Sequence, residues 1–176
     1  MTDDWRKRSL KELYRLTGQI FSQIPELARL WGGAYQALNF ADVPFTPLRK
    51  PLSACRLALI TTGGVHRRDQ EPFDMSDPHG DATYRRIPAS TTLHELTITH
   101  DYYDHSDADR DLNILFPLEL VRHLVNRGII GSLADSYGFM GHIEPPHLNT
   151  LIQQTAPEVA TFLKQDRVDA VLLTPG

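Results

Sequence analysis

The sequence predicts an α/β protein: an open, mostly parallel sheet with covering helices, preceded by an N-terminal helical extension. Apolar runs that suit strands buried on both faces occur at residues 56–62 and 168–174. Segments with helical spacing lie between the two runs; Gly63-Gly64 follows the first run, and Pro175-Gly176 follows the second. Strands that alternate with helices pair in parallel through right-handed crossovers, so these observations favour an open α/β sheet.

The chain divides into an extension, residues 1–50, and an α/β domain, residues 51–176. Two helices are expected in the extension, one between residues 9 and 23 and one beginning at Pro25, because apolar residues recur there at steps of three and four. Three prolines between residues 40 and 51 predict an extended linker. We expect this arm to be a lid, or a contact with a second copy of the chain or another partner, without chemistry of its own.

Further elements follow along the domain. We expect a weaker strand at residues 96–99, a helix at 117–127, a strand at 129–133 and a helix at 146–164 interrupted near Pro157. Pro117 suits a first helical turn, and Gly128 is a typical stop.

Ligands of open α/β sheets bind beyond the carboxyl ends of the strands. Three features are therefore expected at one edge of the sheet: Gly63-Gly64, the loop after Thr99, and residues 174–176. The sequence thus predicts a ligand site where these three segments meet.

Composition excludes several classes of protein. The chain has 176 residues and a net charge of −4, which does not suit a nucleic-acid binder. Its single cysteine, Cys55, excludes an internal disulfide framework and a cysteine-rich zinc site. No apolar run approaches the roughly 20 residues of a membrane span, and the N-terminus does not resemble a secretory signal. We therefore expect a soluble cytoplasmic protein with neither nucleic acid nor membrane as partner.

The densest group of functional residue types is THDYYDHSDADRDLN, residues 99–113, an Asp/His loop. Its alternating Asp residues resemble a calcium loop, but that loop needs Gly at its sixth position and Glu at its twelfth, where this chain has Leu112 and Leu118. Two interpretations remain. The loop is either a hard-metal site of another geometry or, as we favour, a polar loop of Asx turns and helix caps.

A second group lies in residues 63–86, a long segment that follows a strand end. Guanidinium groups bind carboxylates through two parallel hydrogen bonds, which indicates a binding role. The alternative is a solvated loop whose arginines meet the Asp/His loop. The residues concerned are His66, Arg67, Arg68, Asp69, Arg85 and Arg86.

From residue 58 onward the chain resembles the selenoprotein B component of glycine, sarcosine and betaine reductases, together with the related D-proline reductase subunit. The matching segments are ALITTGGVHRRDQEPFD, GDATYRRIP, THDYYDHSDADRDLNILFPLELVRHLVNRGIIGSL, YGFMGH and DAVLLTPG. The resemblance implies reductive cleavage of a bond at the α-carbon of a small amine or amino acid, with protein thiols as electron donor. It also implies that other reductase subunits or a thiol donor are partners.

The family nucleophile is a selenocysteine, or a cysteine in some relatives, directly after a late strand that here reads VDAVLLTPG. We therefore expect selenocysteine to follow Gly176 in a longer form, and the chain to be inactive by itself. Thr174, Pro175 and Gly176 would adjoin this nucleophile. A helix N-terminus facing it would stabilise its anion.

Roles for individual residues are inferred within that mechanism. Arg67 or Arg85 would hold a substrate carboxylate, and His66 or His100 would give a proton to the leaving amine. Asp101 and Asp104 would orient the imidazoles or pair with the ammonium. The alternative function is a non-redox, metal-dependent or ligand-binding protein that uses the Asp/His loop; which metal, if any, stays open.

Overall fold

The computed structural model describes residues 46–176 and positions 16, 20, 24, 26, 27, 29 and 30 before them. Most positions of the two helices expected in the extension, and most of its linker, lie outside the described residues, and the division at residue 50 stays a prediction. Of the described early positions, residues 16, 20, 26, 27, 29 and 30 have helical backbone, and their side chains are exposed.

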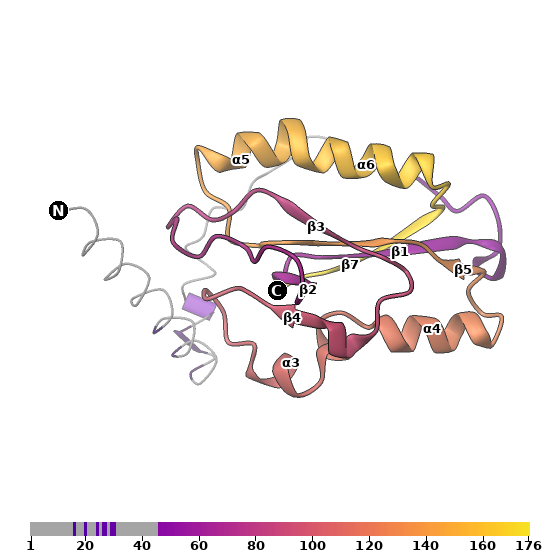
Figure 1. The fold of residues 1–176 in the computed structure, drawn as a ribbon, viewed down its shortest axis with the longest axis horizontal. Helices are drawn as coiled ribbons and strands as arrows, with labels where there is room; N and C mark the ends of the chain where they lie inside the picture. Colours follow the sequence, from indigo (N-terminus) through magenta and orange to yellow (C-terminus); the bar gives the residue numbers. More distant parts are fainter. Residues whose placement is uncertain (1–15, 17–19, 21–23, 25, 28, 31–45) are drawn as a thin grey trace, which may run out of the picture.

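A mostly parallel sheet forms the centre of the domain, as the sequence predicts (Figure 1). β1 (Arg56–Thr61) pairs in parallel with β7 (Ala170–Thr174) along its length. At its start β1 pairs in parallel with β5 (Ser132–Leu133), and at its end with β6 (Ser136–Phe139). The antiparallel strand β3 (Tyr84–Ile87) follows beyond β6.

The expected strand at residues 129–133 is shorter than predicted because its first residues close the preceding helix: the Ile129 and Ile130 amides both donate to the Leu124 carbonyl, at 3.0 and 3.3 Å. A second irregularity follows the strand. Arg56 pairs with Ser132, but Ile60 pairs with Tyr137, so one additional residue lies between β5 and β6. Such an insertion is a β-bulge. The Ser136 hydroxyl accepts a hydrogen bond from the Leu59 amide at 3.0 Å and thereby satisfies a donor that a regular ladder would have paired.

Helices cover both faces of the sheet (Figure 1). α5 (His147–Thr150) and α6 (Ala156–Gln165) cover one face and are joined by a π-helical segment (Leu151–Thr155). The expected helix is interrupted near Pro157, since the π-helical segment ends at Thr155 and Pro157 lies in the first turn of α6, where no intrahelical donor is needed. α3 (Ser106–Arg110) and α4 (Leu118–Asn126) lie on the other side.

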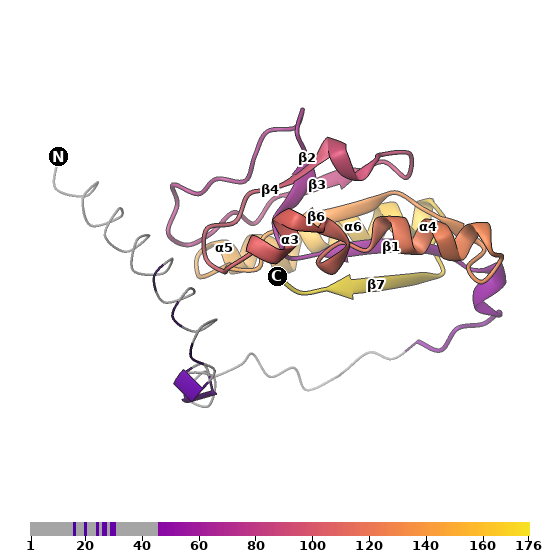
Figure 2. The same cartoon turned by 90° about the horizontal axis from the view of Figure 1, so that it is seen from below.

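The strand expected at residues 96–99 forms outside the main sheet. β4 (Leu96–Ile98) pairs antiparallel with β2 (Val65–Arg67) in a separate two-stranded ribbon (Figure 2). Three short 3₁₀ helices complete the domain: η1 (Leu52–Ala54), η2 (Leu93–Glu95) and η3 (Leu112–Ile114). None of the helices in the described part of the chain is long and apolar enough to span a membrane.

Candidate active site

The ends of β1 and β7 are held together at the carboxyl edge of the sheet. The Thr62 amide donates to the Thr174 carbonyl, and the Gly176 amide donates to the Thr62 hydroxyl, each at 3.1 Å. Gly176 packs so closely that a Cβ there would lie 2.3 Å from the Gly63 Cα. Residues 174–176, which are expected from the sequence to adjoin a nucleophile, therefore lie against the Gly63-Gly64 turn.

The loop after Thr99 reaches the same turn. The Gly64 carbonyl accepts a hydrogen bond from the Thr99 amide at 2.9 Å, and the Tyr103 hydroxyl donates to the Gly63 carbonyl at 3.0 Å. The three segments that the sequence places at one edge thus meet around Gly63-Gly64. This arrangement confirms the convergence expected from the open-sheet rule.

His100 lies within this junction and is 4% exposed. Its ring packs edge-on against Tyr103 with 4.7 Å between the centroids. Nδ1 faces the Tyr102 amide and Nε2 faces the Gly141 amide, each at 3.3 Å. Both ring nitrogens face N–H donors, so a doubly protonated imidazolium has no acceptor on either side.

The environment of His100 favours the neutral imidazole. Burial, followed by the charges of His142 and His105, lowers its pKa to about 4, while the Asp101 carboxylate acts in the opposite direction. At neutral pH the ring is therefore uncharged.

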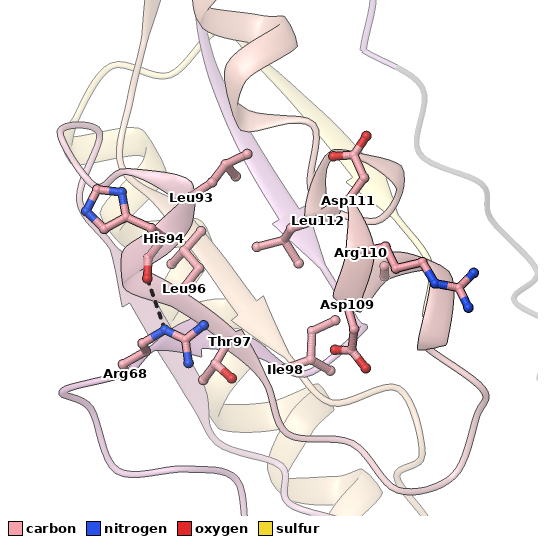
Figure 3. Close-up of a pocket in the computed structure, with 11 residues that line it drawn as sticks. Arg68, Leu93, His94, Leu96, Thr97, Ile98, Asp109, Arg110, Asp111 and Leu112 are labelled. Carbon is pink, nitrogen blue, oxygen red and sulfur yellow. Dashed lines mark hydrogen bonds between the residues drawn. The ribbon is translucent and has the colours of Figure 1, made fainter.

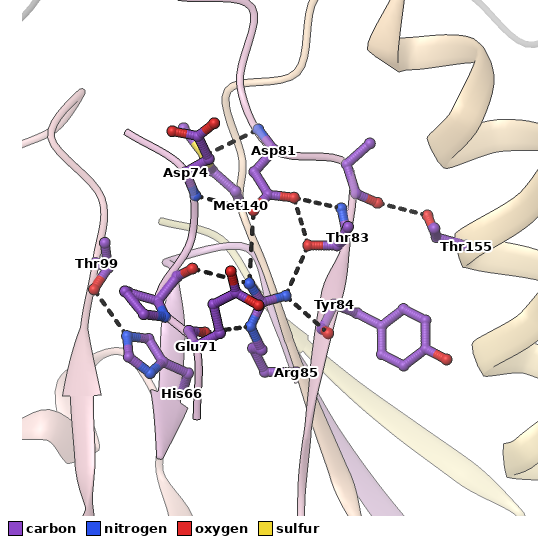
Figure 4. A network of polar contacts seen from close by, with 12 residues as sticks. His66, Glu71, Asp74, Asp81, Thr83, Tyr84, Arg85, Thr99, Met140 and Thr155 are labelled. Carbon is purple, nitrogen blue, oxygen red and sulfur yellow. Dashed lines mark hydrogen bonds and ion pairs between the residues drawn. The ribbon is translucent and has the colours of Figure 1, made fainter. Parts of the chain in front are cut away.

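His66 is also buried, at 3% exposure, and has a definite tautomer. Nδ1 lies 2.7 Å from the Arg67 carbonyl oxygen, which only accepts, so Nδ1 carries the proton. The Thr99 hydroxyl, 2.8 Å from Nε2, then donates to that nitrogen (Figure 4). Burial lowers the pKa of His66, opposed by its hydrogen bond to the Arg67 carbonyl. Thr99 therefore connects the His66 ring to the loop that carries His100.

Arg85 holds the long loop between β2 and β3 in place (Figure 4). Its guanidinium donates to the Glu71 carbonyl at 2.6 Å and the Pro72 carbonyl at 3.0 Å. It also donates to the Thr83 hydroxyl and the Tyr84 carbonyl, and it lies 3.7 Å from the Asp81 carboxylate. The hydrogen bonds use four of the five guanidinium donors, and the Asp81 carboxylate faces the same group at ion-pair distance. In this conformation the guanidinium is engaged within its own loop, and the substrate-binding role of Arg85 stays a prediction.

Phe73 links Arg85 to His66. The Arg85 guanidinium lies 4.5 Å above the centre of the Phe73 ring, and the His66 ring packs edge-on against the same ring. Phe73 is 2% exposed and contacts both side chains, so Arg85 helps to hold the aromatic ring against which His66 packs. No sequence pattern distinguishes Phe73 from the other apolar residues.

Arg67 is placed differently from its neighbour His66. Successive side chains of a strand point to opposite faces, and these two residues are adjacent in β2. The Arg67 guanidinium forms an ion pair with Asp69, and its backbone amide donates to the Gln70 side chain at 2.9 Å. Arg67 and His66 therefore contact different surroundings, and the carboxylate-binding role of Arg67 also stays a prediction.

Several carboxylates of the Asp/His loop bind groups within the loop itself. Asp104 accepts from the Ser106 amide at 3.0 Å and Asp111 from the Asn113 amide at 3.0 Å, which are Asx turns. Asp107 pairs with Arg110 within the α3 helix, and Asp109 pairs with His105, each at 2.8 Å. The Asx turns that the favoured interpretation predicts are therefore present in this loop, and a metal role stays untested. Within residues 46–176 and the few earlier described positions, no three His, Cys, Asp or Glu side chains are grouped to hold a metal.

Asp101 and Asp104 lie in different environments. Asp101 is half-buried beside His100, and its amide faces the Met75 sulfur at 3.4 Å. Asp104 is exposed at the start of α3. Of these two carboxylates, Asp101 is the one whose charge affects the His100 pKa.

A shallow pocket of about 260 Å³ lies between the β2–β4 ribbon and α3 (Figure 3). Its floor is apolar, with Leu96, Ile98 and Leu112, and Arg68 and Asp109 stand at its sides. The Arg68 Nε donates to the His94 carbonyl at 3.0 Å. This pocket does not include either buried histidine of the strand-end junction.

Sequence reasoning missed Thr99 and Tyr103 as functional positions. Both lie inside the 99–113 segment, but the residue types considered there as functional are Asp, His and Arg. Their role depends on backbone partners at Gly63 and Gly64, which are remote in the sequence.

The fold and the junction define an α/β protein with a candidate ligand site at the carboxyl edge of its sheet, lined by two neutral, buried histidines. Residues 29–176 match the family described as glycine/sarcosine/betaine reductase selenoprotein B. The match covers most of the chain, and the chain belongs to this family.

Three relatives support the assignment. The chain is 36% identical over 133 residues to the D-proline reductase subunit gamma of Acetoanaerobium sticklandii, covering 75% of this chain and 53% of that one. It is 31% identical over 146 residues to a glycine reductase complex component B subunit gamma of Symbiobacterium thermophilum, covering 80% and 33%. It is 29% identical over 145 residues to a sarcosine reductase complex component B subunit beta of Peptoclostridium acidaminophilum, covering 77% and 31%.

The chain therefore spans about half the length of the D-proline reductase subunit and about a third of the other two. No solved structure matches it.

Proposed function

We propose that this chain provides the substrate-facing part of a reductase that cleaves a bond at the α-carbon of a small amine or amino acid. The observation that carries the proposal is the junction itself: residues 174–176 lie against Gly63, beside the loop that holds His100. In this proposal a selenolate or thiolate follows Gly176 directly. That nucleophile would then act next to Thr62 and the His100 loop.

The proposed reaction balances with a dithiol as reductant. The selenolate attacks the α-carbon, the C–N bond breaks, and the amine leaves with the bonding electron pair. A thiolate then attacks selenium, the Se–C bond breaks, and the carbon takes up a proton. The second thiol resolves the mixed intermediate, so the dithiol ends as a disulfide and supplies two electrons.

The two histidines and Asp101 suit a cationic substrate. An imidazolium beside the substrate would repel an ammonium group, and burial keeps His100 neutral. The Asp101 carboxylate, close enough to influence His100, pairs with the ammonium in this proposal. His66 and Thr99 form a connected hydrogen-bonded pair, and in this proposal they relay the proton that the α-carbon takes up when the Se–C bond breaks.

An assay on the assembled complex tests this proposal. The complex is isolated from its own cells through a tag on this chain and incubated with dithiothreitol. Glycine, sarcosine, betaine and D-proline are supplied separately, and substrate loss and reductant oxidation are measured. We expect one of the four to be consumed with one dithiol oxidised per molecule. If none is consumed by the intact complex, the proposed reaction is overturned.

A further inference from the structure

β7 has the composition of an internal strand but lies at an edge of the sheet (Figure 2). Three consecutive side chains are exposed: Val171 at 39%, Leu172 at 40% and Leu173 at 69%. Among the residues that the structure describes, β7 pairs with β1 alone. Its other edge therefore presents unpaired backbone donors and acceptors.

Edge strands usually carry features that prevent further pairing, such as charges, proline or a bulge. The β7 sequence, AVLLT, has none of these. Apolar side chains on successive positions are typical of a parallel strand that is covered on both faces and paired on both edges. The residues of β7 thus fit a strand with a second neighbour.

An apolar groove continues from this edge. A pocket of about 380 Å³ lies between the sheet and α6 and extends to Leu173, whose partner in the β1 ladder is Ile60. No residue that lines it is charged, and Thr62 alone carries a hydroxyl. Its walls include Ile60, Phe139, Leu151, Ile152, Val159 and Leu163. The edge and the groove form one surface that fits a strand together with an apolar segment.

We propose that this surface seats a β-strand and an adjoining apolar segment from the part of the reductase polypeptide that this chain does not span. The relatives are about two to three times as long as their matched regions, so they contain polypeptide of the required extent. The added strand pairs with the open edge of β7, and the apolar segment fills the groove beside α6. This proposal concerns assembly and does not depend on the reaction at the strand ends.

Cysteine labelling tests the proposal without requiring turnover. Leu173→Cys places a thiol on the edge strand β7 where the groove ends, and Ile114→Cys is a matched control because Ile114 is 66% exposed on η3. The native Cys55 is fully buried and adds no background. Each variant is labelled with a maleimide in two states: as the purified 176-residue chain, and in the complex that the tagged chain forms in its own cells.

We expect labelling at position 173 to be slower in the complex than in the purified chain by about tenfold or more, as covered sites react only after local opening. Labelling at position 114 should be equal in both states. Equal labelling at position 173 would overturn the proposal. A purified chain that is a dimer by light scattering, with position 173 already protected, would overturn it in favour of a second copy. If Leu173→Cys does not fold, Val171→Cys carries the same test.

Discussion

Gly64 and Thr99 are in backbone contact so close that no side chain fits between them. A Cβ on Gly64 would lie 2.4 Å from the Thr99 carbonyl oxygen, and Gly64 has a φ of 72°. This contact fixes the loop that carries His100 against the ends of β1 and β7. The geometry of the candidate site therefore depends on a glycine that has no chemistry of its own.

Gly64→Ala should destabilise the fold by more than the strain of a positive φ alone. Gly128→Ala is the matched control, since Gly128 has a φ of 70° and a Cβ added there would meet nothing within 4 Å. We expect Gly128→Ala to cost about 1–2 kcal/mol from backbone strain. Gly64→Ala should cost at least about 2 kcal/mol more, because the Thr99 carbonyl cannot move away without disturbing the hydrogen bond from the Thr99 amide to the Gly64 carbonyl. Urea unfolding of both variants measures the difference; equal costs would contradict the close contact.

Arg85 should act as a support for the loop between β2 and β3. Arg85→Lys cannot replace the contacts of a planar guanidinium, so residues 70–83 should exchange amide hydrogens faster in this variant. Arg68→Lys is the control, because the structure gives its side chain one hydrogen bond, to the His94 carbonyl. Hydrogen exchange read by mass spectrometry reports the change. Normal protection of this loop with weakened binding of a carboxylate substrate would instead assign Arg85 to the substrate.

The depressed pKa of His100 should make stability fall in acid. Its pKa is about 4 in the folded protein and 6.5 in the unfolded chain, so the unfolded state takes up the proton first. The stabilisation is complete above pH 6.5 and is lost as the pH falls from 6.5 towards 4. The full loss is about 3 kcal/mol.

Urea unfolding between pH 7 and pH 4 measures this loss, with His100→Asn as the reference. The variant should show a shallower decline than the parent chain over the same interval. Parallel declines would mean that His100 titrates normally in the folded protein.

His66 should be a neutral Nδ1–H tautomer at pH 7. The Arg67 carbonyl accepts the Nδ1 proton, and the Thr99 hydroxyl donates to Nε2. Nitrogen-15 chemical shifts of the ring distinguish the two tautomers directly. Thr99→Val should destabilise the protein by about 1–3 kcal/mol, since Nε2 then loses its donor, whereas Thr99→Ser should retain most of the stability. A dominant Nε2–H tautomer would contradict the assigned hydrogen bonds.

The main elements of the sheet could be predicted because their signals are local. The apolar runs at β1 and β7 and the stripe of α4 follow directly from the order of apolar residues. β2 and β6 have no such signal: β2 has three residues, and β6 contains serine, tyrosine and glycine yet is fully buried. These strands form because neighbouring segments cover them, which is a tertiary effect.

The candidate site was predictable in outline and not in detail. The open-sheet rule placed residues 63–64, 99–103 and 174–176 together, and their hydrogen bonds agree with it. The use of Arg85 within its own loop could not be anticipated, because its acceptors are backbone carbonyls brought near by folding. The same holds for the pKa of His100, which burial determines.

The central claim is that the reductase reaction takes place at the strand-end junction around His100. The measurement that tests it most directly is the rate of substrate-dependent dithiol oxidation by the complex carrying His100→Asn. His123→Asn is the control, since His123 is exposed on α4. We predict that His100→Asn lowers kcat/KM by about 100-fold or more, while the complex stays intact by light scattering and His123→Asn keeps the parent rate. A His100→Asn complex that reduces substrate at the parent rate would contradict the assignment of the active site to this junction.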